Sequence, residues 1–452
     1  MLLLATALGW YSWQLTPSFT QALAQLGTFL LVLIGVTLIA NAKKLSLALY
    51  RNCFLAVCGV LSGLLSLELL LWLSGFPSVP PPSELNPPYL RREHRSGEFE
   101  YLLTTNRFGI RYSDFDPALR TPHERRVLVL GDSFVEGWGV KDSERFTDHL
   151  EAVGGETRFI NGGLSGTGFL EQFRAFKRLD QIYKPDCTLI AVYANDLQET
   201  PAELPEYLFV DSRPRSFAWF LPRLRTHLNL LWRQTDPARS FEFPGGIHRT
   251  LLRHAGVTEG WPTRAAIDHW LKTLPDDALE EAETRTIEPF MLLVGLFTPD
   301  YWLTALDLTG SLAPAKADSS RRVLSELIAA AKAEQRQVVA IYLPSYFQYD
   351  PRSFGSDVPW VMGGTKLSTQ WLNGETTFQK FLRQEFESRS VPFYDLTEDL
   401  RAEETVKPGM VAFRRDGHLT PHGHRVVADL LQRWLAAHNF CAPTVGAVTG
   451  PS

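Results

Sequence analysis

The sequence predicts an α/β protein: a three-layer sandwich around a mainly parallel five-stranded sheet, preceded by transmembrane helices and carrying a largely helical insertion. Five short apolar runs, rich in β-branched and aromatic residues, alternate with helical patterns, which favours helices on both faces of a parallel sheet. With 45% hydrophobic and 21% charged residues, the composition excludes a disordered or collagenous chain. The net charge of −5 disfavours non-specific nucleic-acid binding, which depends on Lys and Arg contacts to phosphate.

Residues 1–76 form the expected transmembrane region. Two apolar stretches, Leu26–Ala42 and Cys53–Phe76, fit helices that cross a hydrocarbon core of ~30 Å, the first of them only just. Met1–Leu15 is apolar but short, so a third span, an interfacial helix and the remainder of a longer segment all stay open. Glu68 lies inside the second span, where snorkelling or protonation is favoured over a functional role.

Basic residues set the expected orientation of these spans. Lys43, Lys44 and Arg51 lie between them, and the positive-inside rule places that loop in the cytoplasm. We therefore expect an anchor in the cell inner membrane and a main domain on the extracytoplasmic, periplasmic side. Residues 77–103, which begin with a cluster of prolines, are expected to form an extended linker.

The main domain is expected over residues 104–440, followed by a tail at 441–452. The five expected strands are 126–133, 158–163, 187–194, 337–344 and 392–397. Helical patterns cover 171–179, 319–334 and 377–388, and a last helix begins at Pro421 with Thr420 as its N-cap. In such sheets the chemistry lies at the carboxyl ends of the strands.

Residues 200–317 break this alternation and are expected to form a mostly helical insertion that holds five of the twelve tryptophans. The insertion could cover the functional edge of the sheet or contact the bilayer, or its aromatic residues could form a small core of their own. Cys187 and Cys441 could pair, but nothing in the sequence places them together, and two buried free thiols are the favoured interpretation.

Ser133 is the candidate nucleophile. It follows the first expected strand in Gly131-Asp132-Ser133, which places it at the functional edge of the sheet, with glycines that let a substrate approach. A serine beside glycine is also common in turns that end strands. Asp416 precedes His418 by two residues, just ahead of the last helix, so the carboxylate can orient an imidazole that takes a proton from the serine.

Two further residues are candidate oxyanion donors. Asn195 ends the third expected strand and can aim its side-chain NH2 at a developing negative charge, and Gly166 in the loop after the second strand can offer a backbone N–H. With the amide of Ser133 they would form an oxyanion hole. Asn and Gly are also good turn formers, which is the alternative for each residue taken singly.

A metal site is the competing interpretation of the C-terminal motif, because Asp416, His418, His422 and His424 are all ligand types. His422 and His424 lie two residues apart at the start of a helix and therefore point in different directions. We expect neither a metal nor another cofactor.

Taken together, these motifs are far more specific than any one alone. They resemble the conserved blocks of the SGNH/GDSL hydrolase superfamily over roughly residues 104–437, and the lead-in 104–111 is similar to that of its membrane-anchored bacterial members. The resemblance implies that Ser133 is the nucleophile, His418 the base and Asp416 its partner. It also implies that the oxyanion hole is formed by Ser133, Gly166 and Asn195.

Two positions depart from the family pattern. Tyr193 stands where many members have glycine. One residue separates Asp416 from His418, where two is the commonest spacing; the shorter spacing is also similar to that of bacterial polysaccharide O-acetyltransferases on this fold.

The expected function is a membrane-anchored extracytoplasmic serine esterase that acts through an acyl-enzyme on an ester of a cell-envelope glycan or lipid. The first alternative is an O-acyltransferase that modifies an envelope polysaccharide with the same triad, together with a partner membrane acyltransferase; it must keep water from the acyl-enzyme. The second is a non-catalytic assembly module in a membrane complex, which the complete set of site residues disfavours. The expected partners are the acylated substrate and the bilayer.

Overall fold

The computed structural model describes residues 85–205, 208, 246–257 and 261–441, together with parts of a helical segment between residues 52 and 73. Contacts divide the chain into two units: Met1–Pro80 with Asp211–Ser240, and Pro81–Val210 with Phe241–Ser452. The expected span Leu26–Ala42 and half of the residues of Cys53–Phe76 lie outside the described residues. Among the described residues no single helix is long and apolar enough to cross a membrane. The helices Pro289–Phe297 and Tyr301–Asp307 reach the required length and hydropathy only when they are taken together, and they are bent by 85°.

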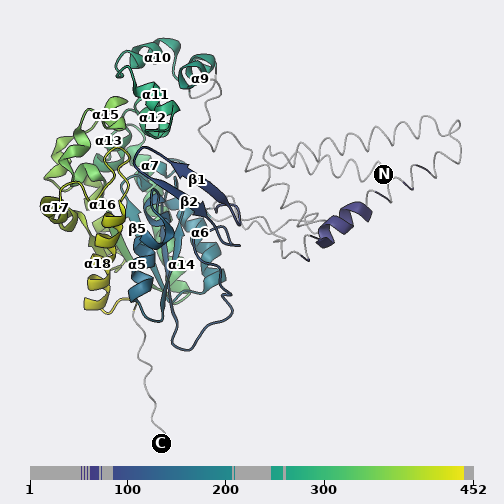
Figure 1. The fold of residues 1–452 in the computed structure, drawn as a ribbon. Coiled ribbons are helices and arrows are strands. Elements are labelled where there is room, and N and C mark those ends of the chain that lie inside the picture. The colour runs from purple at the N-terminus through teal and green to yellow at the C-terminus, as the bar shows by residue number, and fades with distance from the viewer. Residues whose placement is uncertain are drawn as a thin grey trace, which may run out of the picture. The chain divides into compact units, whose positions relative to one another are not determined.

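A sheet lies at the centre of the second unit (Figure 1). It has five parallel strands in the order β4-β3-β5-β6-β7. Each expected strand is present close to its expected bounds: β3 (Arg125–Gly131), β4 (Thr157–Gly163), β5 (Cys187–Tyr193), β6 (Gln337–Leu343) and β7 (Phe393–Asp395). β3 and β5 are buried along nearly their whole length, as continuous apolar runs predict. The expected α/β sandwich with a parallel sheet is confirmed.

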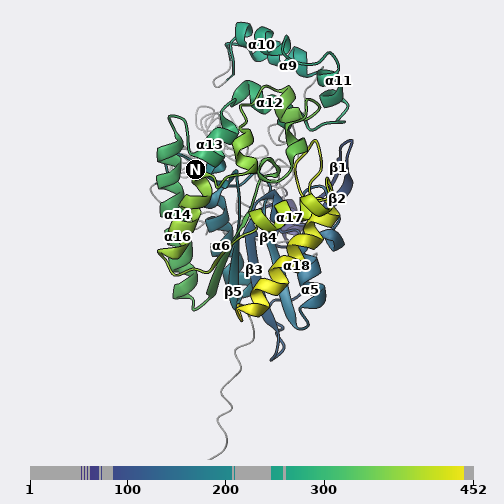
Figure 2. The same ribbon diagram turned by 90° about the vertical axis from the view of Figure 1, so that its left-hand side faces the viewer.

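Helices cover both faces of this sheet and complete three layers (Figure 2). Val127 and Val129 of β3 share a hydrophobic cluster with residues of α5 and α18, whereas Leu128 and Leu130 share one with α6, α14 and α16. The bounds of the layer helices are α5 (Phe146–Val153), α6 (Phe169–Tyr183), α14 (Ala313–Ala333), α16 (Thr377–Glu387), α17 (Thr397–Val406) and α18 (Pro421–Ala437). Shorter helices and turns are α4 (Ser133–Glu136), α7 (Asp196–Glu199), α15 (Pro359–Met362), η1 (Asp142–Glu144), η3 (Tyr346–Gln348), η4 (Pro351–Phe354) and η5 (Thr369–Leu372).

The last helix, α18, begins as the sequence predicts. Thr420 is its N-cap, and the threonine hydroxyl accepts a hydrogen bond from the Gly423 N–H at 3.1 Å. Pro421 occupies the first turn, where its missing N–H costs nothing. This start fixes where the loop that carries His418 enters the helix.

The described part of the insertion is mainly helical. It contains α9 (Ile247–His254), α10 (Arg264–Leu271), α11 (Ala278–Glu283), α12 (Pro289–Phe297) and α13 (Tyr301–Asp307). Its aromatic residues divide between two cores: Trp270 lies in a small core with residues of α9 and α11, whereas Trp302 belongs to the main core, 6.3 Å from the Tyr193 ring. Contact of the insertion with the bilayer stays a prediction. Trp219 and Trp232 lie outside the described residues. Helix α13 therefore packs against the carboxyl end of β5.

An antiparallel hairpin, β1 (Arg91–Arg95) and β2 (Glu100–Thr104), occupies the end of the segment expected as linker. Phe99, Tyr101 and Leu103 of the hairpin form a small buried cluster against Trp138 and Phe413. The first strand, RREHR, has no apolar alternation, so the sequence carries no signal for it. The linker is accordingly shorter than residues 77–103.

A disulfide joins Cys187 and Cys441, whose Cα atoms are 5.4 Å apart. The expectation of two free thiols is therefore wrong. The cysteines are 254 residues apart in the chain, and only the packing of α18 beside the sheet brings them together. The bond ties the start of β5 to the segment that follows α18.

Candidate active site

Ser133 lies at the junction of β3 and α4, at the carboxyl edge of the sheet. Asp132 is the N-cap of α4, and its carboxylate accepts a hydrogen bond from the Phe134 N–H at 2.9 Å. Gly131 is required by close packing, since a Cβ there would lie 2.4 Å from a Val135 methyl carbon and 2.7 Å from the Ala191 carbonyl oxygen. The turn thus presents Ser133 at a fixed position in front of the sheet.

The structure brings Ser133, His418 and Asp416 into one hydrogen-bonded chain. The hydroxyl Oγ of Ser133 is 2.7 Å from His418 Nε2, and His418 Nδ1 is 2.5 Å from Asp416 Oδ1. The same carboxylate oxygen accepts the backbone N–H of His418 at 3.2 Å. Asp416 is therefore placed to hold the imidazole with Nδ1 protonated and Nε2 free to accept the serine proton.

Gly417 makes the short spacing between Asp416 and His418 workable. Its φ of +86° is in the left-handed region, and a Cβ would lie 2.6 Å from the Tyr346 ring. The turn is closed by hydrogen bonds from the Gly417 N–H to the Phe413 carbonyl and from the Phe413 N–H to the His418 carbonyl. One intervening residue is enough here because that residue is glycine.

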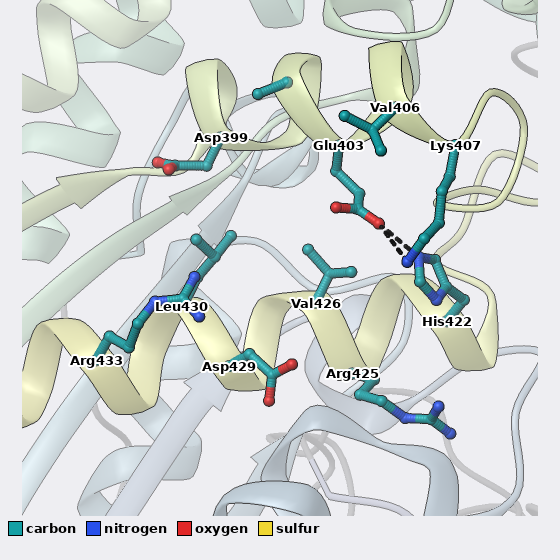
Figure 3. Close-up of a pocket in the computed structure, with 11 residues that line it drawn as sticks. Asp399, Glu403, Val406, Lys407, His422, Arg425, Val426, Asp429, Leu430 and Arg433 are labelled. Atoms are coloured by element: carbon teal, nitrogen blue, oxygen red, sulfur yellow. Dashed lines mark hydrogen bonds and ion pairs between the residues drawn. The ribbon is translucent and has the colours of Figure 1, made fainter.

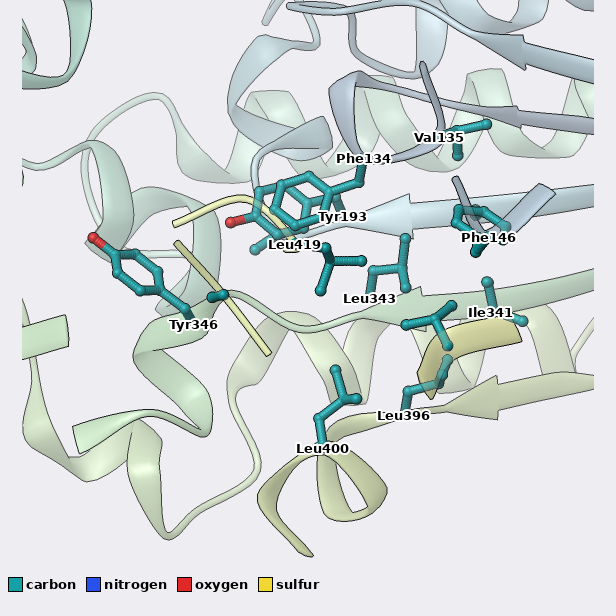
Figure 4. Packing of buried hydrophobic residues seen from close by; sticks show 14 of the residues in the cluster. Phe134, Val135, Phe146, Tyr193, Ile341, Leu343, Tyr346, Leu396, Leu400 and Leu419 are labelled. Atoms are coloured by element: carbon teal, nitrogen blue, oxygen red, sulfur yellow. The ribbon is translucent and has the colours of Figure 1, made fainter. Parts of the chain in front are cut away.

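Aromatic side chains surround the imidazole. The Phe134 ring stacks on His418 at 4.7 Å between ring centroids, and the Trp138 ring lies 5.8 Å away. Trp138 also donates its indole N–H to Asp416 Oδ2 at 3.2 Å. Tyr193, the last residue of β5, stacks on Phe134 at 3.7 Å between ring centroids (Figure 4). The tyrosine therefore supports the residue that packs against His418.

Gly166 and Asn195 lie in the loops that follow β4 and β5, the two strands that flank β3. Gly166 has a φ of +69°, and nothing lies within 4 Å of the place where a Cβ would stand. The neighbouring Ser165 hydroxyl donates to Glu136, one turn after Ser133 on α4.

Tyr301, in the insertion, lies near the Asn195 side chain. Tyr301 of α13 donates its hydroxyl to Glu199 at 2.5 Å. Burial raises the pKa of that hydroxyl well above its usual value, Glu199 raises it further, and a hydrogen bond with the Asn195 side chain opposes the rise. Tyr301 thus links α13 to one candidate oxyanion donor.

The other two histidines of the C-terminal motif do not join the site. His422 Nε2 lies 2.8 Å from Glu403 Oε1, in a groove between α17 and α18 that Lys407 also lines (Figure 3). His424 is buried, and its Nδ1 accepts the Phe146 N–H at 3.2 Å. Within the part of the chain that the structure describes, no group of three or more His, Cys, Asp or Glu side chains is arranged to hold a metal ion.

Buried carboxyl groups lie around the triad. Burial raises the pKa of Asp132, and the Phe134 N–H and His418 oppose that shift. Asp196 accepts hydrogen bonds from the Tyr193 N–H at 2.9 Å and the Gln172 side chain at 2.7 Å, and burial raises its pKa as well. These acids stabilise the turns after β3 and β5 without touching the His418 imidazole.

A further carboxyl comes from the insertion. Burial raises the pKa of Glu288 to about 7; Arg285 opposes the shift, Asp416 adds to it and His418 opposes it. Sequence reasoning missed Glu288, as it missed Trp138 and Glu98. No local motif marks these residues, because their relation to the site depends on contacts between distant segments.

Comparisons with known proteins give structural likeness alone. No protein-family profile and no curated protein matches the chain. The acetyl xylan esterase AlAXEase is 10% identical, over 69% of this chain and 99% of that chain, with a TM-score of 0.32. A lipolytic G-D-S-L protein from Veillonella parvula is 10% identical over 69% of this chain and 98% of that chain, with a TM-score of 0.32. The lipase/acylhydrolase from Enterococcus faecalis is 13% identical over 70% of this chain and 96% of that chain, with a TM-score of 0.31. At these values the likeness assigns neither an activity nor a substrate to this chain.

Proposed function

We propose that the protein is a serine esterase of the SGNH/GDSL type that acts through an acyl-enzyme. The observation that carries the proposal is the hydrogen-bonded chain from Ser133 through His418 to Asp416 at the carboxyl edge of the sheet. A binding or assembly module has no need for a serine hydroxyl held 2.7 Å from an imidazole that a carboxylate orients.

The contacts within the triad support a role for each of its three residues. Ser133 Oγ attacks the ester carbonyl while His418 Nε2 takes its proton, and Asp416 stabilises the imidazolium that forms. The backbone N–H groups of Ser133 and Gly166 and the side-chain NH2 of Asn195 are the proposed donors to the oxyanion. His418 then returns the proton to the leaving alcohol, and a water attacks the acyl-enzyme.

Transfer to a sugar hydroxyl is the second candidate, and one observation favours it. The single residue between Asp416 and His418 is the spacing that the sequence shares with polysaccharide O-acetyltransferases, and Gly417 accommodates it without loss of the triad contacts. Phe134 and Trp138 pack beside the imidazole, and such apolar surface limits access of water to an acyl-enzyme.

We further propose that the main domain is extracytoplasmic, anchored in the inner membrane, and acts on an ester of an envelope glycan or lipid. The loop that carries Lys43, Lys44 and Arg51 supports this orientation. The Cys187–Cys441 disulfide adds support, because such bonds persist in oxidising compartments. A reporter fused to the C-terminus that is active only in the cytoplasm should stay silent; a signal from it would overturn the topology.

Turnover of a small ester tests the proposed chemistry. The full-length chain is incubated with p-nitrophenyl acetate, with and without oligosaccharide acceptors, beside the Ser133→Ala variant. Release of acetate without acceptor supports hydrolysis, and acetylated oligosaccharide supports transfer. Absence of both products from the folded wild-type chain would overturn the proposal.

A further inference from the structure

The tip of the β1–β2 hairpin touches the loop that carries Asp416. Glu98 lies in this tip, which is closed by a hydrogen bond from the Ser96 N–H to the Phe99 carbonyl at 2.9 Å. One oxygen of the Glu98 carboxylate, Oε2, accepts the backbone N–H groups of Arg415 and Asp416, both at 2.9 Å. The contact thus joins a segment near the start of the described domain to the residue that orients His418.

We propose that Glu98 is a positioning residue for the triad, an inference that rests on the proposed serine esterase function. Hydrogen bonds from N–H groups to a carboxylate are short and strong compared with bonds between neutral groups. Two of them from consecutive residues fix the peptide plane from which the Asp416 side chain leaves. That side chain then reaches His418 Nδ1 at 2.5 Å, so the position of Glu98 is transmitted to the imidazole in two steps.

The hairpin tip is held by the insertion as well. The Gly97 N–H donates to the Thr286 carbonyl at 3.0 Å, and a Cβ on Gly97 would lie 2.7 Å from that oxygen. Arg415 uses its guanidinium to bind Glu281 of α11 at 2.9 Å while its N–H binds Glu98. Insertion, hairpin tip and triad loop therefore form one connected network, and the tip has little freedom to move without Asp416.

The surroundings of Glu98 favour a fixed carboxylate over a mobile surface side chain. It is partly buried, and burial raises its pKa, whereas the N–H groups of Asp416 and Arg415 oppose that shift. A polar group in such a place is costly unless it is hydrogen-bonded. The two N–H groups satisfy it, which ties the hairpin tip to a single arrangement.

Four full-length proteins test this inference by kcat and KM for p-nitrophenyl acetate: wild type, Glu98→Ala, Glu98→Gln and Glu98→Asp. Glu98→Ala and Glu98→Asp should lower kcat, by about 10²-fold for alanine, because a displacement of ~1 Å at a catalytic group can cost that much. KM should stay unchanged, since Glu98 does not contact the substrate. Glu98→Gln should keep most of the wild-type kcat, because its side-chain oxygen still accepts both N–H groups.

Glu100→Ala is the matched control, since it removes an exposed glutamate two residues away on the same hairpin that pairs with Arg95 at the surface. It should behave like the wild type. The rate at which a fluorophosphonate probe labels Ser133 gives a second readout of triad geometry that is independent of substrate binding. It should fall in parallel with kcat.

Two results would overturn the positioning role: wild-type kcat in both Glu98→Ala and Glu98→Asp, or a Glu98→Gln variant as impaired as alanine. If Glu98→Ala does not fold, Glu98→Asp decides alone. A wild-type chain that neither hydrolyses the ester nor takes up the probe contradicts the proposed function instead. The two failures are therefore distinguishable.

Discussion

The indole N–H of Trp138 donates a hydrogen bond to Asp416 Oδ2 at 3.2 Å, while Asp416 Oδ1 binds His418. Each oxygen of the Asp416 carboxylate thus has its own partner. Trp138 lies five residues after Ser133, so a single short segment carries the candidate nucleophile and a residue that restrains the far end of the triad. Replacement of this indole should therefore affect the chemistry rather than the fold.

Trp138→Phe should lower kcat by about 10-fold, because the loss of one charge-assisted hydrogen bond of ~1.5 kcal/mol leaves Asp416 less restrained. Steady-state kinetics with p-nitrophenyl acetate give the value. Trp371→Phe is the matched control: it also loses an indole bond to a carboxylate, Asp307 at 2.9 Å, but away from the triad. A Trp138→Phe variant with the kcat of the control would argue against a role for the indole.

Substitution of the three C-terminal histidines by alanine should give three different outcomes. His418→Ala should abolish turnover with the fold retained. His422→Ala should keep wild-type activity, because its imidazole binds Glu403 in the groove between α17 and α18. His424→Ala should lower the free energy of unfolding by about 2–4 kcal/mol through a cavity and an unpaired Phe146 N–H. Kinetics and urea unfolding of the three variants distinguish these effects; equal inactivity of folded His422→Ala would mean that the base is misassigned.

Glu288 should make the stability of the protein depend on pH. Its folded pKa of about 7 is above the ordinary 4.5, so the folded chain binds a proton that the unfolded chain releases. Stability should therefore fall as the pH rises from about 4.5 through 7, by at most about 3 kcal/mol, and stay low above that. Glu288→Gln should flatten this decline in urea unfolding measured from pH 5 to pH 8.

The exposed Glu280→Gln on the same segment serves as the control and should keep the wild-type slope. If Glu288→Gln and Glu280→Gln show identical pH profiles, the raised pKa of Glu288 does not contribute to stability.

Loss of the Cys187–Cys441 disulfide should destabilise the main domain by about 2–5 kcal/mol, since the bond closes a long loop of the unfolded chain. Urea unfolding with and without reductant measures the effect. The double variant Cys187→Ala with Cys441→Ala should show the lower stability and no response to reductant. Thiol labelling that finds both cysteines free in the protein isolated from its native compartment would contradict the bond.

Sequence reasoning succeeded where the signal is local. Continuous apolar runs predicted all five strands of the sheet, and Thr420 with Pro421 predicted the start of α18. Ser133 and His418 follow from their places at element ends, and the structure puts them 2.7 Å apart although 285 residues separate them. The parallel sheet explains this success, because its topology brings the carboxyl ends of the strands to one edge.

What the sequence could not predict depends on contacts between distant segments. The strand RREHR has no apolar alternation, so the sequence pattern predicts a linker where the structure has a hairpin. The bond of Glu98 to the triad loop and the pairing of Cys187 with Cys441 need the folded chain to place them. The residues next to Trp138 in the sequence form no motif, and only the hydrogen bond from its indole to Asp416 indicates a role.

The central claim is that Ser133 is the nucleophile, and the site of covalent labelling tests it most directly. The full-length chain is treated with a fluorophosphonate probe, digested and analysed by mass spectrometry, beside Ser133→Ala. The account predicts one adduct per chain, on Ser133, and no adduct and a loss of turnover by several orders of magnitude in the variant. An adduct on another residue, or a Ser133→Ala protein that retains most of the esterase activity, would contradict it.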